Sequence, residues 1–252
     1  MTTPSEPEVA CYVYGVVPTS VRLPEQLRGL GPTGRVSLVR SEEIAAVVGD
    51  VSLGRPLGTR ADLMGHEQVL DALVVAGITI APMRFGSVVT NEQVVIDELL
   101  VPHQDYFTAL LRDLTKRTQF TLTGRYEEEP VLREVLEEYP AIRALQGAIS
   151  ELSPEQAYHQ RLRLGEMIVG ALEEKRQEDG ADVLDALTPY AVDVVARAPA
   201  QADGVVDAAF LVADERRDEF DAAVEDCGRQ LAGRVRLRLL GPVPAYDFVS
   251  GQ

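Results

Sequence analysis

Residues 119–126, QFTLTGRY, decide the fold. Apolar, aromatic or small residues occupy every second position of this stretch, and polar or charged residues lie between them. Such a period of two is typical of a β-strand. Further along the chain we expect a helix, two strands, a helix and a strand, at residues 129–186, 190–197, 205–213, 214–231 and 234–240. This order is the ferredoxin-like arrangement, in which four antiparallel strands carry both long helices on one face.

The long helical segment of this domain is clearest after Ser153-Pro154, a helix cap followed by proline at the first helical position. Apolar residues recur there at spacings of three and four, which places them on one helical face. This apolar stripe comprises Tyr158, Leu162, Gly165, Ile168, Val169 and Leu172.

The first 85 residues repeat the same order in a weaker form. Residues 9–17, VACYVYGVV, are rich in β-branched and aromatic residues and predict a strand. We then expect a short helical turn at 24–30, strands at 35–40 and 45–51, a helix capped by Thr59 and a strand at 78–81. The fold class is therefore α+β with two domains. Their expected bounds are an N-terminal α+β domain (1–90), a helical connector (91–118), a C-terminal ferredoxin-like domain with a long helical insertion (119–241) and an extended tail packed on the surface (242–252).

Charge and cysteine content exclude several classes of function. The chain has 24 Lys plus Arg and 40 Asp plus Glu, a net charge of −16. Such a charge argues against general binding to nucleic acid or to anionic membranes. The two cysteines, Cys11 and Cys227, fit no metal-binding spacing and are typical of core thiols in a reducing compartment.

No motif predicts catalysis, a cofactor or a metal site. Residues 29–34, GLGPTG, match the dinucleotide fingerprint GxGxxG, but the fingerprint needs a strand before it and a helix after it. Here a strand follows, so we interpret the motif as a plain loop. His66 has no second histidine or cysteine four residues on, which excludes HExxH-type zinc binding and favours a core or capping role.

Two stretches are candidates for contact with a partner. Arg234, Arg236 and Arg238 alternate with apolar residues, so a period of two would place all three on one sheet face. In a ferredoxin-like domain that face is the one left open by the helices, and it could accept a partner's acidic helix; a solvent-facing stripe is the equal alternative. The second candidate is the loop at 82–87, PMRFGS, with Arg84 and Phe85. Closure of the core by Met83 and Phe85 is the favoured interpretation there, and a binding role is the alternative.

Three stretches together resemble the gas vesicle protein family GvpL/GvpF. They are residues 12–17, YVYGVV; residues 66–70, HEQVL, with 80–88, IAPMRFGSV; and residues 240–249, LGPVPAYDFV. Their order spans nearly the whole chain. In one respect the sequence departs from the family pattern, because Val243 stands where a tryptophan is usual.

The resemblance implies an accessory or minor structural protein of gas vesicle assembly that is not an enzyme and needs no cofactor. It implies that the partners are the major shell protein GvpA and other gas vesicle accessory proteins, and that the protein is found at the gas vesicle with a soluble cytoplasmic pool. We add a physical interpretation: an acidic helper stays in solution and offers complementary surface to an apolar shell subunit. A ferredoxin-like module that senses a small molecule is the alternative function.

Overall fold

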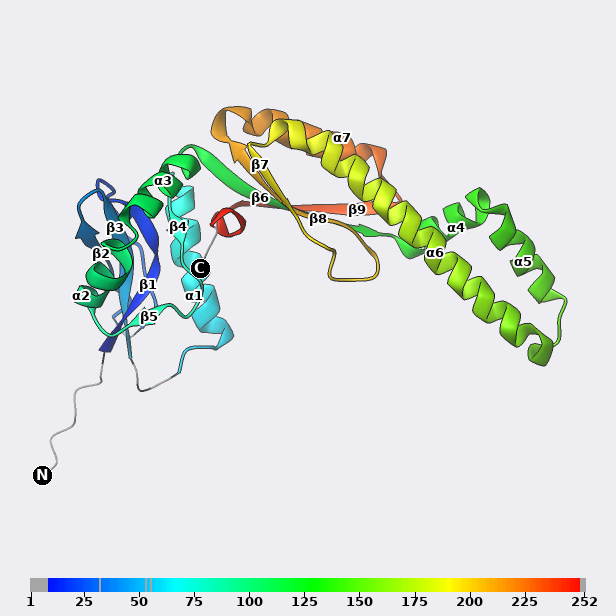
Figure 1. The fold of residues 1–252 in the computed structure, drawn as a ribbon, viewed down its shortest axis with the longest axis horizontal. Coiled ribbons are helices and arrows are strands. Elements are labelled where there is room, and N and C mark those ends of the chain that lie inside the picture. The colour runs from blue at the N-terminus through cyan, green and yellow to red at the C-terminus, as the bar shows by residue number, and fades with distance from the viewer. Residues whose placement is uncertain (1–8, 32, 53, 55, 250–252) are drawn as a thin grey trace, which may run out of the picture. The chain divides into compact units, whose positions relative to one another are not determined.

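The computed structural model describes residues 9–31, 33–52, 54 and 56–249. The chain divides into two compact units. Unit 1 comprises residues 1–120 and 241–252, and unit 2 comprises residues 121–240. Each unit contains one β-sheet with helices packed on it (Figure 1).

The sheet of unit 1 has the strand order β2-β3-β1-β4, with β5 also paired to β1. Its strands are β1 (Val9–Pro18), β2 (Val36–Ser41), β3 (Ile44–Ser52), β4 (Ala81–Pro82) and β5 (Val88–Val89), and every pair is antiparallel. This is the ferredoxin-like strand order without a helix between the first two strands. The helical turn expected at 24–30 is wrong, since the described residues there form only turns and bends. Pro24 and Gly29 leave that segment no helical periodicity.

Helices cover both faces of this sheet (Figure 1). α1 (Arg60–Val75) packs on one face, and it begins at the predicted cap Thr59, which forms a capping box with Asp62. The other face is covered by the π-helical turn η1 (Val95–Leu100), which follows the short helix α2 (Glu92–Val94), and by α3 (Gln104–Leu114). The break between η1 and α3 contains Pro102, as predicted. The residues expected to be a connector therefore supply core side chains to unit 1.

Strand β1 is buried on both faces, and alternation divides its side chains between the two helical layers. Ala10, Tyr12 and Tyr14 pack toward α1, whereas Cys11, Val13 and Val16 pack toward α3. The register shifts between Val13 and Gly15, so the alternation resumes one residue later. A β-carbon at Gly15 would lie 2.6 Å from the carbonyl oxygen of Ala81, and glycine is therefore required at this close approach.

The sheet of unit 2 has the order β7-β8-β6-β9, which is the predicted ferredoxin-like order. Its strands are β6 (Arg117–Tyr126), β7 (Asp193–Ala196), β8 (Gly204–Ala213) and β9 (Val235–Val243). The long helices α6 (Pro154–Leu187) and α7 (Arg217–Gln230) contact β8 from the same face (Figure 1). The rings of Phe210 and Phe220 lie 5.4 Å apart in this layer.

Three helices form the expected helical insertion. α4 (Glu128–Glu138) and α5 (Pro140–Ser150) precede α6 and pack against its N-terminal half. Prolines open α5 and α6, which explains why the helical pattern is divided at those points. The small core between the three helices contains Val135, Ile142 and Ala171. Three members of the predicted apolar stripe lie outside that core and are exposed: Tyr158, Leu162 and Val169.

Candidate contact surfaces

The β4–β5 loop, residues 82–88, is held on unit 1 by backbone hydrogen bonds to β1. The Met83 amide donates to the Tyr14 carbonyl at 2.8 Å, and the Val13 amide donates to the Ser87 carbonyl at 2.9 Å. Gly86 turns the loop with a φ of +92°, a conformation that favours glycine. The loop is therefore a fixed feature of the surface.

The two candidate residues of this loop have different environments. The ring of Phe85 is half-buried and lies 5.7 Å from the ring of His66 and 6.4 Å from that of Tyr12. Phe85 thus closes the core, as one of the two interpretations of this loop predicted. Arg84 is exposed and available to a partner.

His66 is fully buried on α1 and lies between two tyrosine hydroxyls. Its Nδ1 is 2.9 Å from the Tyr12 hydroxyl, and its Nε2 is 2.7 Å from the Tyr246 hydroxyl. Burial lowers the pKa of His66 to about 4, against a smaller opposing effect of a hydrogen bond with the Met83 backbone. The imidazole is therefore neutral at pH 7. The predicted core role of His66 is confirmed.

Tyr246 belongs to the C-terminal segment, which folds back onto unit 1. After β9 the chain forms a 3-10 turn at Tyr246–Phe248, and the Tyr246 ring packs on the same core as Tyr12. The next residue, Asp247, is bonded to Gln119, whose amide nitrogen donates to the carboxylate at 2.6 Å and whose amide oxygen accepts the Asp247 amide proton at 3.2 Å. Sequence patterns could not identify these partners, because Tyr246 follows His66 by 180 positions.

The second surface lies on the sheet of unit 2. Arg236 and Arg238 are exposed on β9, and together with Arg125 and Thr123 of β6 they line a hollow of about 420 Å³. The Arg236 guanidinium lies 2.6 Å from the carboxylate of Glu127, yet 79% of its side chain remains exposed. We call Arg125, Arg236 and Arg238 the arginine face. Sequence reasoning missed Arg125, although the alternation in residues 119–126 already set it apart from the apolar positions.

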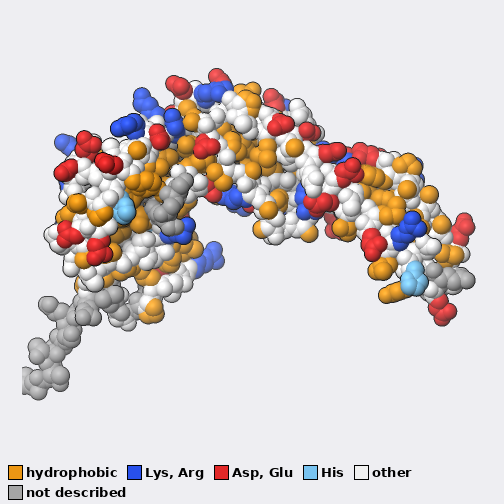
Figure 2. Space-filling view, in the orientation of Figure 1, with side chains coloured by type: hydrophobic (Ala, Val, Ile, Leu, Met, Phe, Trp, Pro, Cys, Tyr) orange, Lys and Arg blue, Asp and Glu red, His pale blue; other side chains and the backbone are white. Residues whose placement is uncertain are grey.

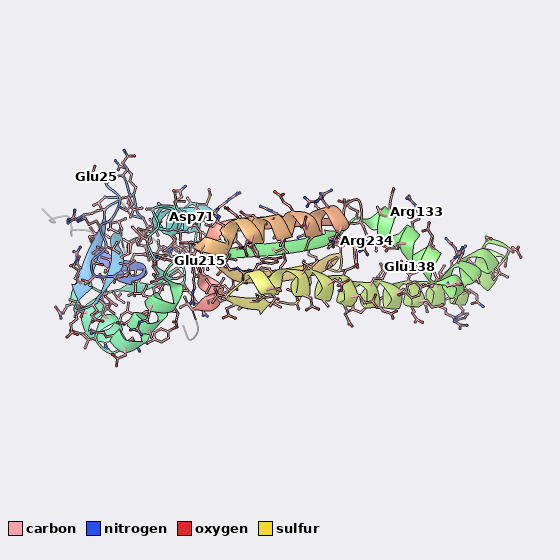
Figure 3. The ribbon with its side chains drawn as sticks, turned by 90° about the horizontal axis from the view of Figure 1, so that it is seen from above. Glu25, Asp71, Arg133, Glu138, Glu215 and Arg234 are labelled. Atoms are coloured by element: carbon pink, nitrogen blue, oxygen red, sulfur yellow. The ribbon has the colours of Figure 1, made fainter. Side chains whose placement is uncertain are left out.

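Arg234 does not join the arginine face, and the expectation that all three arginines share one face is wrong for it. Its guanidinium donates two hydrogen bonds of 2.8 Å to Asp179 of α6 and lies 3.4 Å from Glu134 of α4. Figure 3 shows Arg234 at the end of unit 2 from which the helical insertion extends. Arg234 precedes β9, and Gly233 before it has a φ of +77°, so the period of two does not extend to this position. Its charge stabilises the packing of the helices.

Lys175 forms a related ion-paired cluster inside the helical insertion. Its ammonium lies 3.0 Å from Glu134 and 2.7 Å from Glu138. Burial alone would lower the pKa of this lysine, but the two carboxylates outweigh it and the pKa is raised. The acidic residues after Tyr126 therefore include structural partners of Arg236, Lys175 and Arg234.

The described residues contain no group of three or more His, Cys, Asp and Glu side chains that could hold a metal ion. Cys11 and Cys227 are both buried and free. No helix among these described residues has the length and apolarity needed to cross a lipid bilayer. In the GLGPTG motif, the described residues form a loop that leads into strand β2, and Pro32 lies outside the described residues.

Comparison with known proteins gives one consistent result. Residues 10–250 match the family model described as gas vesicle synthesis protein GvpL/GvpF. Gas vesicle protein F of Streptomyces sp. (strain CB03234) is 32% identical over 245 residues, covering 96% of this chain and 100% of that protein. The crystal structure of GvpF from Anabaena sp. PCC7120 has a TM-score of 0.83 at 23% identity, and that from Microcystis aeruginosa has 0.76 at 24%. Each covers 96% of this chain and 99% of the solved one.

Proposed function

Because the chain belongs to the gas vesicle synthesis protein family GvpL/GvpF, we propose that it is an accessory protein of gas vesicle assembly that binds the major shell protein GvpA. The protein acts at the gas vesicle and is supplied from a soluble cytoplasmic pool, and other gas vesicle accessory proteins are further partners. This role requires exposed contact residues and no reactive centre.

The observation that carries the proposal is the arginine face. Three exposed arginines line one hollow together with two acidic residues, Glu127 and Asp203, so the patch has a net charge of 3 − 2 = +1 in a chain whose net charge is −16. Guanidinium groups favour carboxylates because they donate paired, charge-assisted hydrogen bonds. An acidic segment of the shell protein would therefore be guided to this face and away from the rest of the surface.

The β4–β5 loop supplies the second contact. Its backbone is fixed by β1, and Phe85 is held against His66, so Arg84 is presented without a large entropic cost of ordering the loop on binding. Arg234 has no part in either contact, since Asp179 and Glu134 already bind it.

Capture of co-expressed GvpA on immobilised protein tests both surfaces. The variant Arg236→Ser/Arg238→Ser removes two charges from the arginine face, and Arg84→Ser removes the charge of the loop. The matched control is Arg22→Ser/Arg229→Ser, which removes two exposed arginines elsewhere. We expect reduced capture by the first two variants and normal capture by the control. Normal capture by both surface variants would show that these surfaces are wrongly assigned.

A further inference from the structure

Helix α6 exposes an apolar stripe that the fold of unit 2 does not use. Tyr158, Leu162 and Val169 are 64%, 58% and 66% exposed, although all three lie in the interior of a long helix. Hydrophobic side chains are visible along the helical end of this unit (Figure 2). Several large apolar groups exposed together on one helical face are typical of an interaction site.

This stripe is distinct from the face of α6 that packs on α4 and α5. The packed face comprises Leu164, Met167, Ile168, Ala171 and Leu172, which share a small core with Val135 and Ile142. At 100° per residue, Tyr158, Leu162 and Val169 lie about 110° to 150° from the centre of that face, which is roughly a third of a turn or more. The small core of the helical insertion therefore cannot account for them.

The spacing of the stripe is that of a coiled-coil seam. Tyr158, Leu162, Gly165 and Val169 follow one another at intervals of four, three and four, which are alternating d and a positions of a heptad repeat. A β-carbon added to Gly165 would have no neighbour within 4 Å, so another helix can approach closely there. We call Tyr158, Leu162, Gly165 and Val169 the α6 seam.

Charged residues on either side of the seam indicate which helix fits it. Arg161 and Glu166 are exposed, lie on opposite sides of the seam and are five residues apart. These are the g and following e positions, which face each other when two identical helices pair in parallel and in register. Each arginine would then meet a glutamate of the other helix. The segment also holds Glu155 and Arg163, so it is locally neutral despite the chain's charge of −16.

We propose that the α6 seam binds the α6 seam of a second copy of this chain, parallel and in register, to form a two-fold symmetric dimer. In such a dimer Arg161 of each copy pairs with Glu166 of the other, and this charge complementarity favours a second copy of the chain as the partner helix. A two-fold axis closes the assembly, so each copy uses the same surface once. The inference goes beyond the proposed function, because neither the arginine face nor the β4–β5 loop takes part in it.

Charge exchange tests the identity of the occupant. In sedimentation at physiological salt, the wild-type chain should shift toward twice its mass as concentration rises. Arg161→Glu and Glu166→Arg should each remain monomeric, because each places like charges across the seam, whereas an equal mixture of the two should dimerise again. Val75→Glu, on an exposed apolar residue of α1, is the matched control and should dimerise normally. A wild-type chain that stays monomeric, or a mixture that does not recover, would overturn the proposal.

Cysteine cross-linking tests the direction of pairing. Tyr158→Cys should form a disulfide with itself under mild oxidation, since equivalent residues meet in a parallel dimer. The wild-type chain should not, because Cys11 and Cys227 are buried. In an antiparallel pair Tyr158→Cys would cross-link instead to Val169→Cys in a mixture of the two variants. That result, or no cross-link in either sample, would contradict the parallel seam.

Discussion

Acid should destabilise unit 1 through His66, and the size of the effect follows from its pKa. The pKa is about 4 in the folded protein because the imidazole is buried between Tyr12 and Tyr246, whereas an ordinary histidine has 6.5. Between these values the unfolded chain binds a proton that the folded chain does not. The free energy of unfolding is therefore fully retained above pH 6.5 and falls as the pH drops toward 4. The total loss is about 3 kcal/mol, at about 1.4 kcal/mol for each tenfold change in proton affinity.

Urea unfolding of the wild type and of His66→Gln between pH 7 and pH 4 measures this loss. Near-ultraviolet circular dichroism follows the tyrosines packed around His66. Burial raises the pKa values of Glu67 and Asp71, which act in the opposite direction, but both residues are present in both proteins and cancel in the difference. The unfolding free energy of the wild type relative to that of His66→Gln should fall by about 3 kcal/mol between pH 7 and pH 4. His103→Gln, at an exposed histidine, should match the wild type. A difference between wild type and His66→Gln that does not change with pH would refute the reasoning.

Three further predictions concern stability, and each is checked by denaturant unfolding at pH 7. Gly15→Ala should destabilise the protein by about 1–3 kcal/mol, because its β-carbon would lie 2.6 Å from a backbone oxygen; wild-type stability would contradict the requirement for glycine. Arg234→Gln should cost about 3 kcal/mol, because the buried Asp179 carboxylate would keep the hydrogen bond from the Tyr126 hydroxyl but lose its cationic partner, whereas Arg236→Gln should change stability by less than about 0.5 kcal/mol. Equal effects of these two substitutions would argue against the different roles assigned to them. Thr59→Ala should cost about 1 kcal/mol by removing the cap of α1, and an unchanged midpoint would show that the capping box is not needed.

The strand order of both sheets could be predicted from the sequence because local periodicity and chain order constrain it. The alternation in residues 119–126 and the apolar run at 9–17 each mark a central strand, and a buried His66 follows from its position on the apolar face of a helix. Such patterns are local. They could not pair His66 with Tyr246 or Gln119 with Asp247, since these contacts join residues that are far apart in the sequence.

Periodicity also failed where it was extended beyond its physical basis. A period of two placed Arg234 on the same sheet face as Arg236, but the strand begins only at Val235 and the backbone turns at Gly233. In α6 the three-and-four spacing identified an apolar stripe correctly, yet spacing cannot say whether anything covers it. The exposure of Tyr158 and Leu162 became visible only in the folded chain.

Complementation of a host whose gene for this protein has been deleted tests the central claim most directly. The cells are given the wild-type protein, Arg236→Ser/Arg238→Ser or the matched control Arg22→Ser/Arg229→Ser, and the floating fraction is measured at equal protein levels. If contact through the arginine face supports vesicle assembly, the wild type and the control restore flotation and the arginine-face variant does not. Flotation of the deletion host without any complement, or full rescue by the arginine-face variant, would contradict the account.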